Sequence, residues 1–338
     1  MKDIKGLTVC PCTLAEGYVT YSPIGLKRLF DGKKVSHRMD FLHISDFDNE
    51  EIVSNIGCIS LSGVQEKYSA VIDNSELRLA VDGEQGRYIL KPIPVEKGIR
   101  FRHNLPANEH LTMQIAKQIF KIETAECGLI FNADAYPLYI TKRFDIVADG
   151  SKINQEDFAS LIGRTKQLNG DNFKYQGSYM DIAEEIKRRV AAYPVELAKF
   201  FNLIVFNYVF GNNDAHLKNF SLMQTVDGDF KLTPAYDLLN ATLHVEDSDF
   251  ALEDGLSLDM PLSDIYSQKG HPTKADFEIF GKLIGLNNKQ ITKIISLYIA
   301  DDTSSKVELL IKRSYLEDKL KRMYLRSYEE RMCRFNRK

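Results

Sequence analysis

The chain has 338 residues, of which 44% are hydrophobic and 27% charged, and its formal net charge is −3. This length predicts two lobes or domains, and the near-neutral charge excludes a global basic field of the kind that binds nucleic acid or anionic membranes. No apolar run approaches the length of a membrane span or of a signal peptide, and five scattered cysteines argue against a disulfide framework, so we expect a cytoplasmic protein.

The first half of the chain predicts one short helix followed by a β-rich segment. The helix begins at Pro23 and is stopped by Asp31 and Gly32. Runs rich in β-formers, separated by turn residues, then predict an antiparallel meander with one long helix packed beside it. The expected strands are residues 59–64, 68–72, 77–81, 87–90, 127–131 and 137–141, and the expected helix is 107–120.

The second half reads as mainly helical. Expected helices are 155–162, 180–192, 195–210, 275–299 and 304–335, with two strands at 221–224 and 230–233. The fold class is therefore α+β, with the order of a two-lobed protein kinase. We expect an N-terminal extension over 1–55, a small β-rich N-lobe over 56–148 and a larger helical C-lobe over 149–338.

Cys10 and Cys12 flank Pro11 in a pattern that could form half of a zinc knuckle. No second pair of ligands follows nearby, so two free thiols are the favoured interpretation.

A polar loop follows the very apolar segment 200–210 and carries the strongest chemical signal. Asp214 and Asn219 have the spacing that protein kinases use for the catalytic Asp and a Mg²⁺-binding Asn. Asp237 lies downstream of the expected hairpin, where a second metal ligand is needed, and Mg²⁺ prefers such oxygen ligands. Taken singly, each of these residues could instead be a loop or helix cap.

Other kinase parts are less specific. Lys91 ends a β-rich run and could neutralise phosphates, with Glu109 of the next helix as its partner, although a strand-end lysine is commonly a solvated rim residue. The segment 55–67 lacks a Walker A pattern, and it could cap phosphates or form a plain hairpin turn. The segment 139–145 could offer backbone groups to adenine or be an ordinary edge strand.

Six blocks together resemble the HipA family of toxin kinases: residues 60–67, 90–92, 143–145, 155–158, 213–221 and 232–237. The resemblance implies a two-lobed, ATP- and Mg²⁺-dependent, non-specific serine/threonine protein kinase. It implies the toxin of a type II toxin–antitoxin system, which phosphorylates a host protein, expected to be an aminoacyl-tRNA synthetase, and so inhibits translation and growth.

The family's roles carry over to named positions of this chain. Asp214 would be the catalytic base, Asn219 and Asp237 would bind Mg²⁺, and Lys91 would hold phosphates. The remaining ATP-binding positions would be Ser62, Gly63, Val64, Gln65, Glu66 and Lys67 in the phosphate-covering loop, Lys142, Arg143 and Phe144 at the hinge, and His216, Lys218 and Tyr236.

The family also autophosphorylates on a serine of this loop, which the resemblance assigns to Ser60 or Ser62. Because a phosphate there would repel the phosphates of ATP, we expect the modification to inactivate the enzyme. A Ser-x-Ser pair and the missing N-terminal subdomain are similar to the short HipT branch. That branch implies a small HipS-like antitoxin and a HipB-like DNA-binding antitoxin, with DNA contacted only through the antitoxin.

Three alternatives stay open. The scaffold could phosphorylate a small molecule or another protein, with the acidic residues Glu246, Asp247, Asp249, Glu253, Asp254 and Asp259 as a lid, a solvated loop or a receptor for a basic segment. It could be a non-catalytic pseudokinase. The C-terminal helix, whose charges are of mixed sign, could bind DNA but more simply forms a solvated face.

Overall fold

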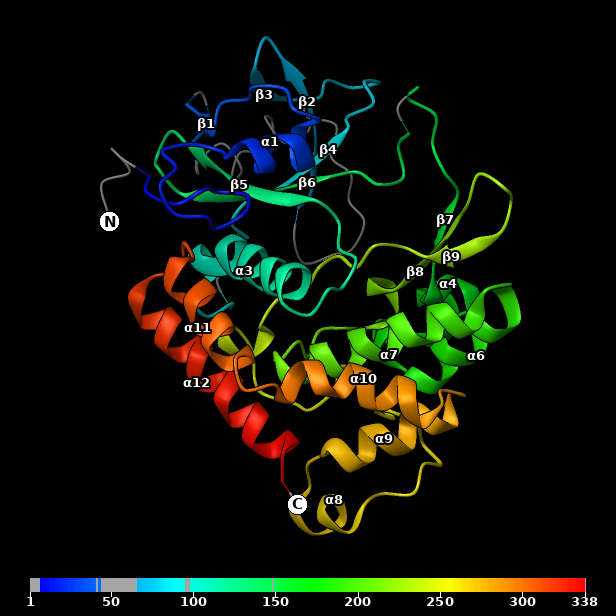
Figure 1. Cartoon of the computed structure of the whole chain (residues 1–338). Coiled ribbons are helices and arrows are strands. Elements are labelled where there is room, and N and C mark those ends of the chain that lie inside the picture. The colour runs from blue at the N-terminus through cyan, green and yellow to red at the C-terminus, as the bar shows by residue number, and fades with distance from the viewer. Residues whose placement is uncertain (1–6, 41, 44–65, 95–97, 148, 338) are drawn as a thin grey trace. The chain divides into compact units, whose positions relative to one another are not determined.

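The computed structural model describes residues 7–40, 42–43, 66–94, 98–147 and 149–337 (Figure 1). It divides into two compact units. Unit 1 comprises Met1–Gln114, Ala125–Phe144 and Glu308–Lys321, and unit 2 comprises Ile115–Thr124, Asp145–Val307 and Arg322–Lys338. A β-rich N-terminal region and a helical C-terminal region confirm the predicted α+β class. The strand expected over 59–64 lies outside the described residues.

Unit 1 is built on a six-stranded sheet with the order β1-β5-β6-β4-β2-β3. Its strands are β1 (Arg38–Met39), β2 (Tyr68–Asp73), β3 (Glu76–Leu79), β4 (Tyr88–Lys91), β5 (Cys127–Asn132) and β6 (Pro137–Lys142). All neighbours pair antiparallel except β1 and β5, which are parallel. The antiparallel arrangement was predicted; β1 was not, because two residues carry no readable alternation.

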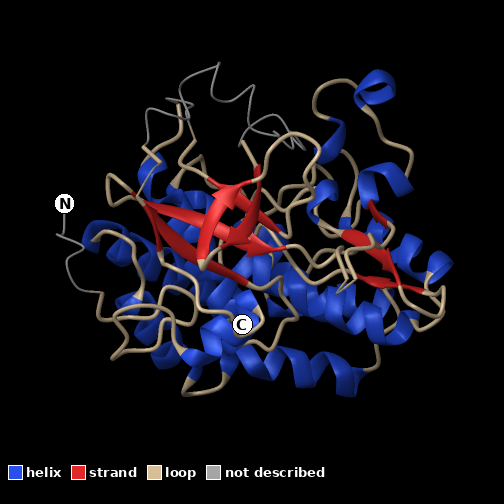
Figure 2. Ribbon diagram, turned by 90° about the horizontal axis from the view of Figure 1, so that it is seen from above, coloured by secondary structure: helices blue, strands red, loops and turns tan. Residues whose placement is uncertain are grey.

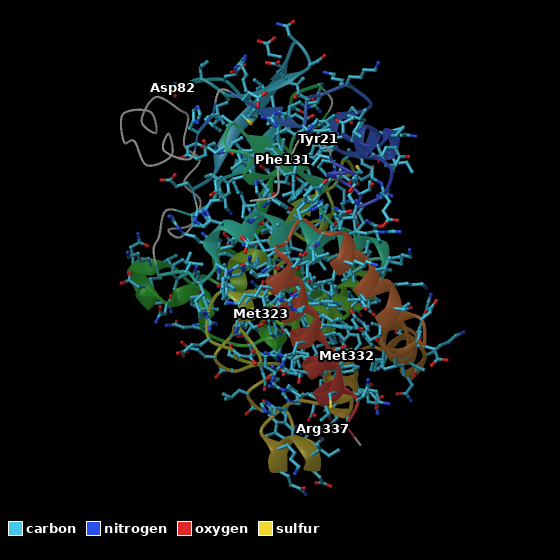
Figure 3. All side chains as sticks on the ribbon, turned by 90° about the vertical axis from the view of Figure 1, so that its left-hand side faces the viewer. Tyr21, Asp82, Phe131, Met323, Met332 and Arg337 are labelled. Carbon is cyan, nitrogen blue, oxygen red and sulfur yellow. The ribbon has the colours of Figure 1, made fainter. Side chains whose placement is uncertain are left out.

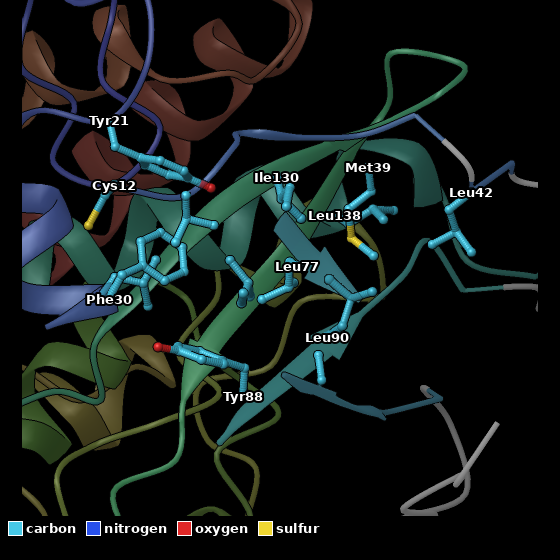
Figure 4. Close-up of a cluster of buried hydrophobic side chains, with 14 of the residues drawn as sticks. Cys12, Tyr21, Phe30, Met39, Leu42, Leu77, Tyr88, Leu90, Ile130 and Leu138 are labelled. Carbon is cyan, nitrogen blue, oxygen red and sulfur yellow. The ribbon is translucent and has the colours of Figure 1, made fainter. Parts of the chain in front are cut away.

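The N-terminal part of the chain packs on this sheet. Helix α1 (Pro23–Phe30) begins at Ser22, whose hydroxyl accepts the N–H of Gly25 at 3.1 Å, and it ends at Asp31 in a left-handed conformation. Figure 4 shows Tyr21 and Phe30 among the buried side chains of the strands, and their rings meet edge to face at 5.0 Å. This apolar cluster forms the core of unit 1.

The two N-terminal cysteines belong to the same core. Cys10 and Cys12 are buried and free. The Cys10 sulfur accepts the backbone N–H groups of Cys12, Thr13 and Ser22, as in a metal knuckle. Among the described residues, however, no three His, Cys, Asp or Glu side chains gather in a way that could hold a metal ion.

The remaining helices lie mainly in unit 2. They are α3 (Leu105–Gln118), which begins in unit 1, then α4 (Phe158–Leu161), α5 (Lys166–Asn169), α6 (Tyr179–Arg189), α7 (Tyr193–Val209), α8 (Asp264–Lys269), α9 (Lys274–Leu283), α10 (Asn288–Ile299), α11 (Thr303–Arg313) and α12 (Asp318–Phe335). Short 3-10 helices are η2 (Arg102–Asn104), η3 (Phe173–Tyr175), η4 (Leu217–Asn219) and η5 (Ala241–Leu243).

Unit 2 also has its own small sheet, in the order β7-β8-β9 (Figure 2). Its strands are β7 (Gln155–Asp157), β8 (Ser221–Gln224) and β9 (Phe230–Leu232). The hairpin of β8 and β9 was predicted, but β7 falls where the sequence predicted the start of a helix. Asp157 explains the difference, because its side chain caps the N–H of Ser160, so the helix begins only at Phe158.

Both expected closing helices are divided. The segment predicted as one helix over 275–299 forms α9 and α10, because Gly285 adopts a left-handed conformation with φ of 95°. The segment over 304–335 likewise forms α11 and α12. No helix of the described residues is long and apolar enough to cross a membrane.

The C-terminal helix is not simply a solvated face. Figure 3 labels Met323 and Met332 along α12. Arg331, beside Met332, is only 2% exposed, and its guanidinium pairs with Asp247 and Asp249. The predicted solvated face is therefore wrong at this arginine, because two acidic side chains distant in sequence neutralise it inside unit 2.

Candidate active site

A buried helix delivers the polar loop of the site. Helix α7 is buried from Leu203 to Val209, and the chain leaves it at Gly211 with φ of 61°. A Cβ at this position would lie 2.8 Å from Cγ2 of Thr242, so only glycine fits. The carbonyl of Gly211 accepts the N–H of Ala241 at 3.0 Å. The loop that follows is thus tied to the chain beyond Asp237.

Asp214 is held by a tyrosine from another element. The hydroxyl of Tyr175, at the end of η3, donates to Oδ1 of Asp214 at 2.8 Å, and Tyr179 donates to the next carbonyl, that of Ala215, at 3.0 Å. Burial raises the pKa of Asp214, and the negative charge of Asp237 raises it further, while Tyr175 acts in the opposite direction. Asp214 is therefore a positioned carboxylate whose proton affinity is above that of an ordinary Asp.

Asn219 presents an oxygen that is not used by the fold. It ends η4, and its backbone N–H donates to the carbonyl of His216 at 2.9 Å. Its side-chain Oδ1 is buried and has no hydrogen-bond partner among the described residues. A buried acceptor without a partner is costly in free energy unless a ligand satisfies it.

Asp237 follows β9 in a backbone conformation that is rare for a residue with a side chain. Its φ is 56°, in the left-handed region, and such residues often occur at functional sites. Its charge favours the protonated form of Asp214, His216 and Tyr236, although burial outweighs it at His216. The three sequence-predicted acceptors Asp214, Asn219 and Asp237 thus belong to one region of unit 2.

These acceptors fit a magnesium ion bound together with nucleotide phosphates. Mg²⁺ takes hard oxygen ligands and needs only one or two carboxylates from the protein. The unpartnered Oδ1 of Asn219 would supply one oxygen, and the carboxylate of Asp237 would supply another.

His216, Lys218 and Tyr236 surround this centre. Burial lowers the pKa of His216 to about 3, so its ring is neutral, and it packs edge to face on Tyr175 at 5.2 Å. Tyr236 donates to the carbonyl of Lys218 at 2.9 Å and thereby supports η4. The Lys218 ammonium lies 3.6 Å from Asp157.

Lys91 forms the charged centre of unit 1. At the end of β4 its Nζ lies 2.6 Å from Oε1 of Glu109 on α3, and both residues are at most 3% exposed. The ammonium also lies 5.1 Å from the centroid of the Tyr139 ring on β6. The expected partnership with Glu109 is confirmed, whereas a solvated rim lysine is wrong.

The hinge residues lie at the end of β6 in unit 1. The side chain of Lys142 pairs with Asp31, and the backbone N–H of Lys142 donates to the carbonyl of Glu126 at 2.8 Å. The N–H of Arg143 donates to the carbonyl of Arg87 at 2.9 Å. A bound base would therefore need backbone groups other than these two N–H groups.

Most of the predicted phosphate-covering loop falls outside the described residues: Ser60, Ser62, Gly63, Val64 and Gln65. Glu66 and Lys67 are described and directly precede β2. Glu66 accepts the hydroxyl of Tyr68.

No role was predicted from the sequence for three residues that shape the centre in unit 2, although Asp157 and Asn213 lie within the blocks 155–158 and 213–221. Tyr175 is 39 positions from Asp214, and the short η3 gives no periodic signal. Asn213 donates from Nδ2 to the carbonyl of Glu246 at 2.8 Å, and Asp157 faces Lys218. For Asn213 and Asp157, membership of these blocks was the signal that could have suggested their involvement, and for Tyr175 there was none.

Comparison with known proteins gives one family match and several relatives. The HipA-like C-terminal domain matches residues 59–305. A Haemophilus influenzae protein named "Putative kinase" is 29% identical over 348 residues, covering 96% of this chain and 95% of that protein. "Putative kinase Y4mE" of Sinorhizobium fredii is 30% identical over 194 residues, covering 55% of this chain and 43% of that protein.

Among solved structures, the HipA chain of a Shewanella oneidensis HipA–HipB–operator DNA complex is similar in fold. The TM-score is 0.57 at 16% sequence identity, covering 86% of this chain and 66% of that one. At this identity the similarity supports the fold class.

Proposed function

The chain belongs to the family of HipA-like C-terminal domains, and from that membership we propose that it is an ATP- and Mg²⁺-dependent serine/threonine protein kinase. In this proposal residues 56–148 act as the nucleotide-covering lobe and 149–338 as the catalytic lobe, with 1–55 as an extension. The observation that carries the proposal is the centre of unit 2, where Asp214 is positioned by Tyr175 and Oδ1 of Asn219 has no partner among the described residues.

ATP supplies the transferred phosphoryl group, and Mg²⁺ neutralises charge on its phosphates. Asp214 accepts the proton of the substrate hydroxyl. The oxygen of that hydroxyl attacks the γ-phosphorus of ATP, and ADP leaves. Asn219 and Asp237 would hold the metal through their side-chain oxygens.

The other residues assist this step. Lys91, kept in place by Glu109, would bind phosphates. Lys142, Arg143 and Phe144 would border the base. His216 stays neutral and so adds no charge beside Asp214.

We further propose that the kinase is a toxin of the short HipT branch. Its protein target would be an aminoacyl-tRNA synthetase, and phosphorylation would stop translation; such a target implies action in the cytoplasm. The solved Shewanella HipA is in complex with HipB and operator DNA. By analogy we expect a HipB-like antitoxin and a small HipS-like antitoxin as partners, with DNA contacted through the antitoxin.

Control would come from Ser60 and Ser62. A phosphate on either would add nearly two negative charges to the proposed phosphate-covering loop and oppose ATP binding. Mass spectrometry of ATP-treated protein is expected to find one of them modified in the wild type and neither in Asp214→Asn. An unmodified active enzyme would rule this control out.

The kinase activity is tested by phosphoproteomics after induction, with wild type and Asp214→Asn compared. Loss of the base should lower phosphoryl transfer about 10²- to 10⁴-fold. The variant should fold normally, because asparagine can still accept the hydrogen bond from Tyr175. Equal growth arrest and equal phosphorylation in both strains would reject the proposal. Label transferred only to a small molecule would favour the alternative substrate class.

A further inference from the structure

The acidic stretch after Asp237 divides into two parts that differ in how their charges are satisfied. In the first part, Arg331 donates from Nη1 to Asp249 at 2.8 Å and from Nη2 to the carbonyl of Ser248 at 2.7 Å, and it also pairs with Asp247. His271 lies 3.1 Å from the same Asp249. These carboxylates are already paired and serve the fold of unit 2.

The second part, Glu253 and Asp254, is different. Both side chains are exposed, and no lysine, arginine or histidine of the described residues forms an ion pair with either. Two neighbouring carboxylates without cationic partners create a local negative potential that attracts a positively charged group.

These two residues line a hollow of about 360 Å³ in unit 2. Its other walls are mostly apolar and include Phe250, Leu258 and Tyr266. Leu258 is 75% exposed, so its side chain is accessible to a bound peptide. Among the described residues that line the hollow, none is basic. The hollow thus combines several apolar side chains with two acidic ones.

The wall of this hollow is continuous with the segment that positions Asp214. The N–H of Glu253 donates to the carbonyl of Tyr175 at 2.9 Å, and that of Asp254 to the carbonyl of Gly177 at 3.0 Å. Tyr175 is the residue whose hydroxyl holds Asp214. Gly255 has φ of 58°, and a Cβ there would lie 3.2 Å from the Phe250 ring, so the backbone makes this turn against the aromatic wall.

We propose that this hollow docks the protein substrate through a segment in which a large apolar side chain is flanked by lysine or arginine. The apolar side chain enters beside Leu258 and Phe250, and the basic side chains face Glu253 and Asp254. The inference rests on the proposed kinase function only in calling the occupant a substrate. Docking itself is a binding event that needs no nucleotide.

The test measures binding of fluorescein-labelled short peptides to the full chain by fluorescence polarisation, without ATP. One peptide carries leucine flanked by arginines; the second has glutamates in place of the arginines, and the third has serine in place of the leucine. The first peptide should bind most tightly and should weaken as salt is added. Equal binding of the first two peptides, or binding of none, would overturn the proposal.

Matched variants locate the site. Glu253→Gln/Asp254→Asn should lower the affinity for the arginine peptide about 3- to 10-fold, as expected for two partly exposed ion pairs. Leu258→Ser should weaken it through loss of apolar contact. Asp227→Asn/Asp229→Asn removes the same charge from the exposed turn between β8 and β9 and should change nothing. An equal loss in this control would mean that net charge, and not the hollow, attracts the peptide.

The two proposals fail separately. Peptide binding without label transfer to any protein would contradict the kinase and leave the docking site standing. Label transfer with the same KM in wild type and Glu253→Gln/Asp254→Asn would contradict docking and leave the kinase standing.

Discussion

Unit 1 and unit 2 each hold a charged centre, and the two differ in how far their polar atoms are satisfied. Lys91 and Glu109 form a buried ion pair at 2.6 Å within unit 1. In unit 2, Asp214 and Asp237 repel each other electrostatically, and Oδ1 of Asn219 has no partner among the described residues. The first centre therefore has its opposite charges paired within the fold, whereas the second holds like charges and an unused oxygen, which is what the proposed cationic ligand requires.

The largest effect, a loss of stability, is expected from breaking the Lys91–Glu109 ion pair. Lys91→Met should destabilise the protein by about 3–5 kcal/mol, because it leaves the carboxylate of Glu109 buried without its cation. Lys91→Met/Glu109→Leu should recover most of this loss. Chemical denaturation measures both variants. If Lys91→Met is no less stable than Lys91→Met/Glu109→Leu, the ion pair is not a buried structural unit.

A smaller effect is expected from the tyrosine that holds Asp214. The hydrogen bond from Tyr175 lowers the pKa of Asp214, so Tyr175→Phe should raise it. Because the base must be deprotonated, activity would then be lost at higher pH as the solution is acidified. We expect the acid limb of kcat to move to higher pH.

The control for this shift is Tyr179→Phe, because the hydroxyl of Tyr179 donates to the carbonyl of Ala215 and not to Asp214. Its acid limb should stay close to that of the wild type. A downward shift in Tyr175→Phe, or an equal shift in both variants, would contradict the assignment of Asp214 as the titrating base.

The smallest effect concerns the stability contribution of Asn219 in unit 2. Asn219→Leu removes a buried oxygen that the fold does not use, so without ligand it should be neutral or stabilising by up to about 1 kcal/mol. Asn202→Leu is the matched control, because Oδ1 of Asn202 accepts the hydroxyl of Tyr298 at 2.7 Å. That variant should lose about 1–3 kcal/mol. Equal losses in both would mean that Asn219 is a structural residue.

Much of the fold could be predicted because local signals agree with the tertiary structure. Pro23 and Asp31 bound a helix, and the alternating runs around Asp73 and Asp82 form strands. The errors arise where one polar residue decides the outcome. Asp157 delays the start of α4, and Gly285 divides what read as one helix.

The candidate site was predicted from spacing only where its residues are close in the chain. Asp214 and Asn219 share one loop, so their pattern is readable. Tyr175 and Arg331 act across 39 and 82 positions, respectively, on Asp214 and Asp249, and a single sequence gives no signal for such pairs. Likewise the acidic stretch could not be divided into paired and unpaired carboxylates before Arg331 was located.

The most direct test of the proposed metal site at Asn219 and Asp237 is Mg²⁺-dependent thermal stabilisation by a non-hydrolysable ATP analogue. The wild type should gain more in Tm with analogue and Mg²⁺ together than with analogue and EDTA, because in the proposed site Asn219 and Asp237 would bind the metal only together with the phosphates. Asn219→Leu should keep its fold and lose this Mg²⁺-dependent increment. A wild type without the increment, or a variant that retains it in full, would contradict the central claim.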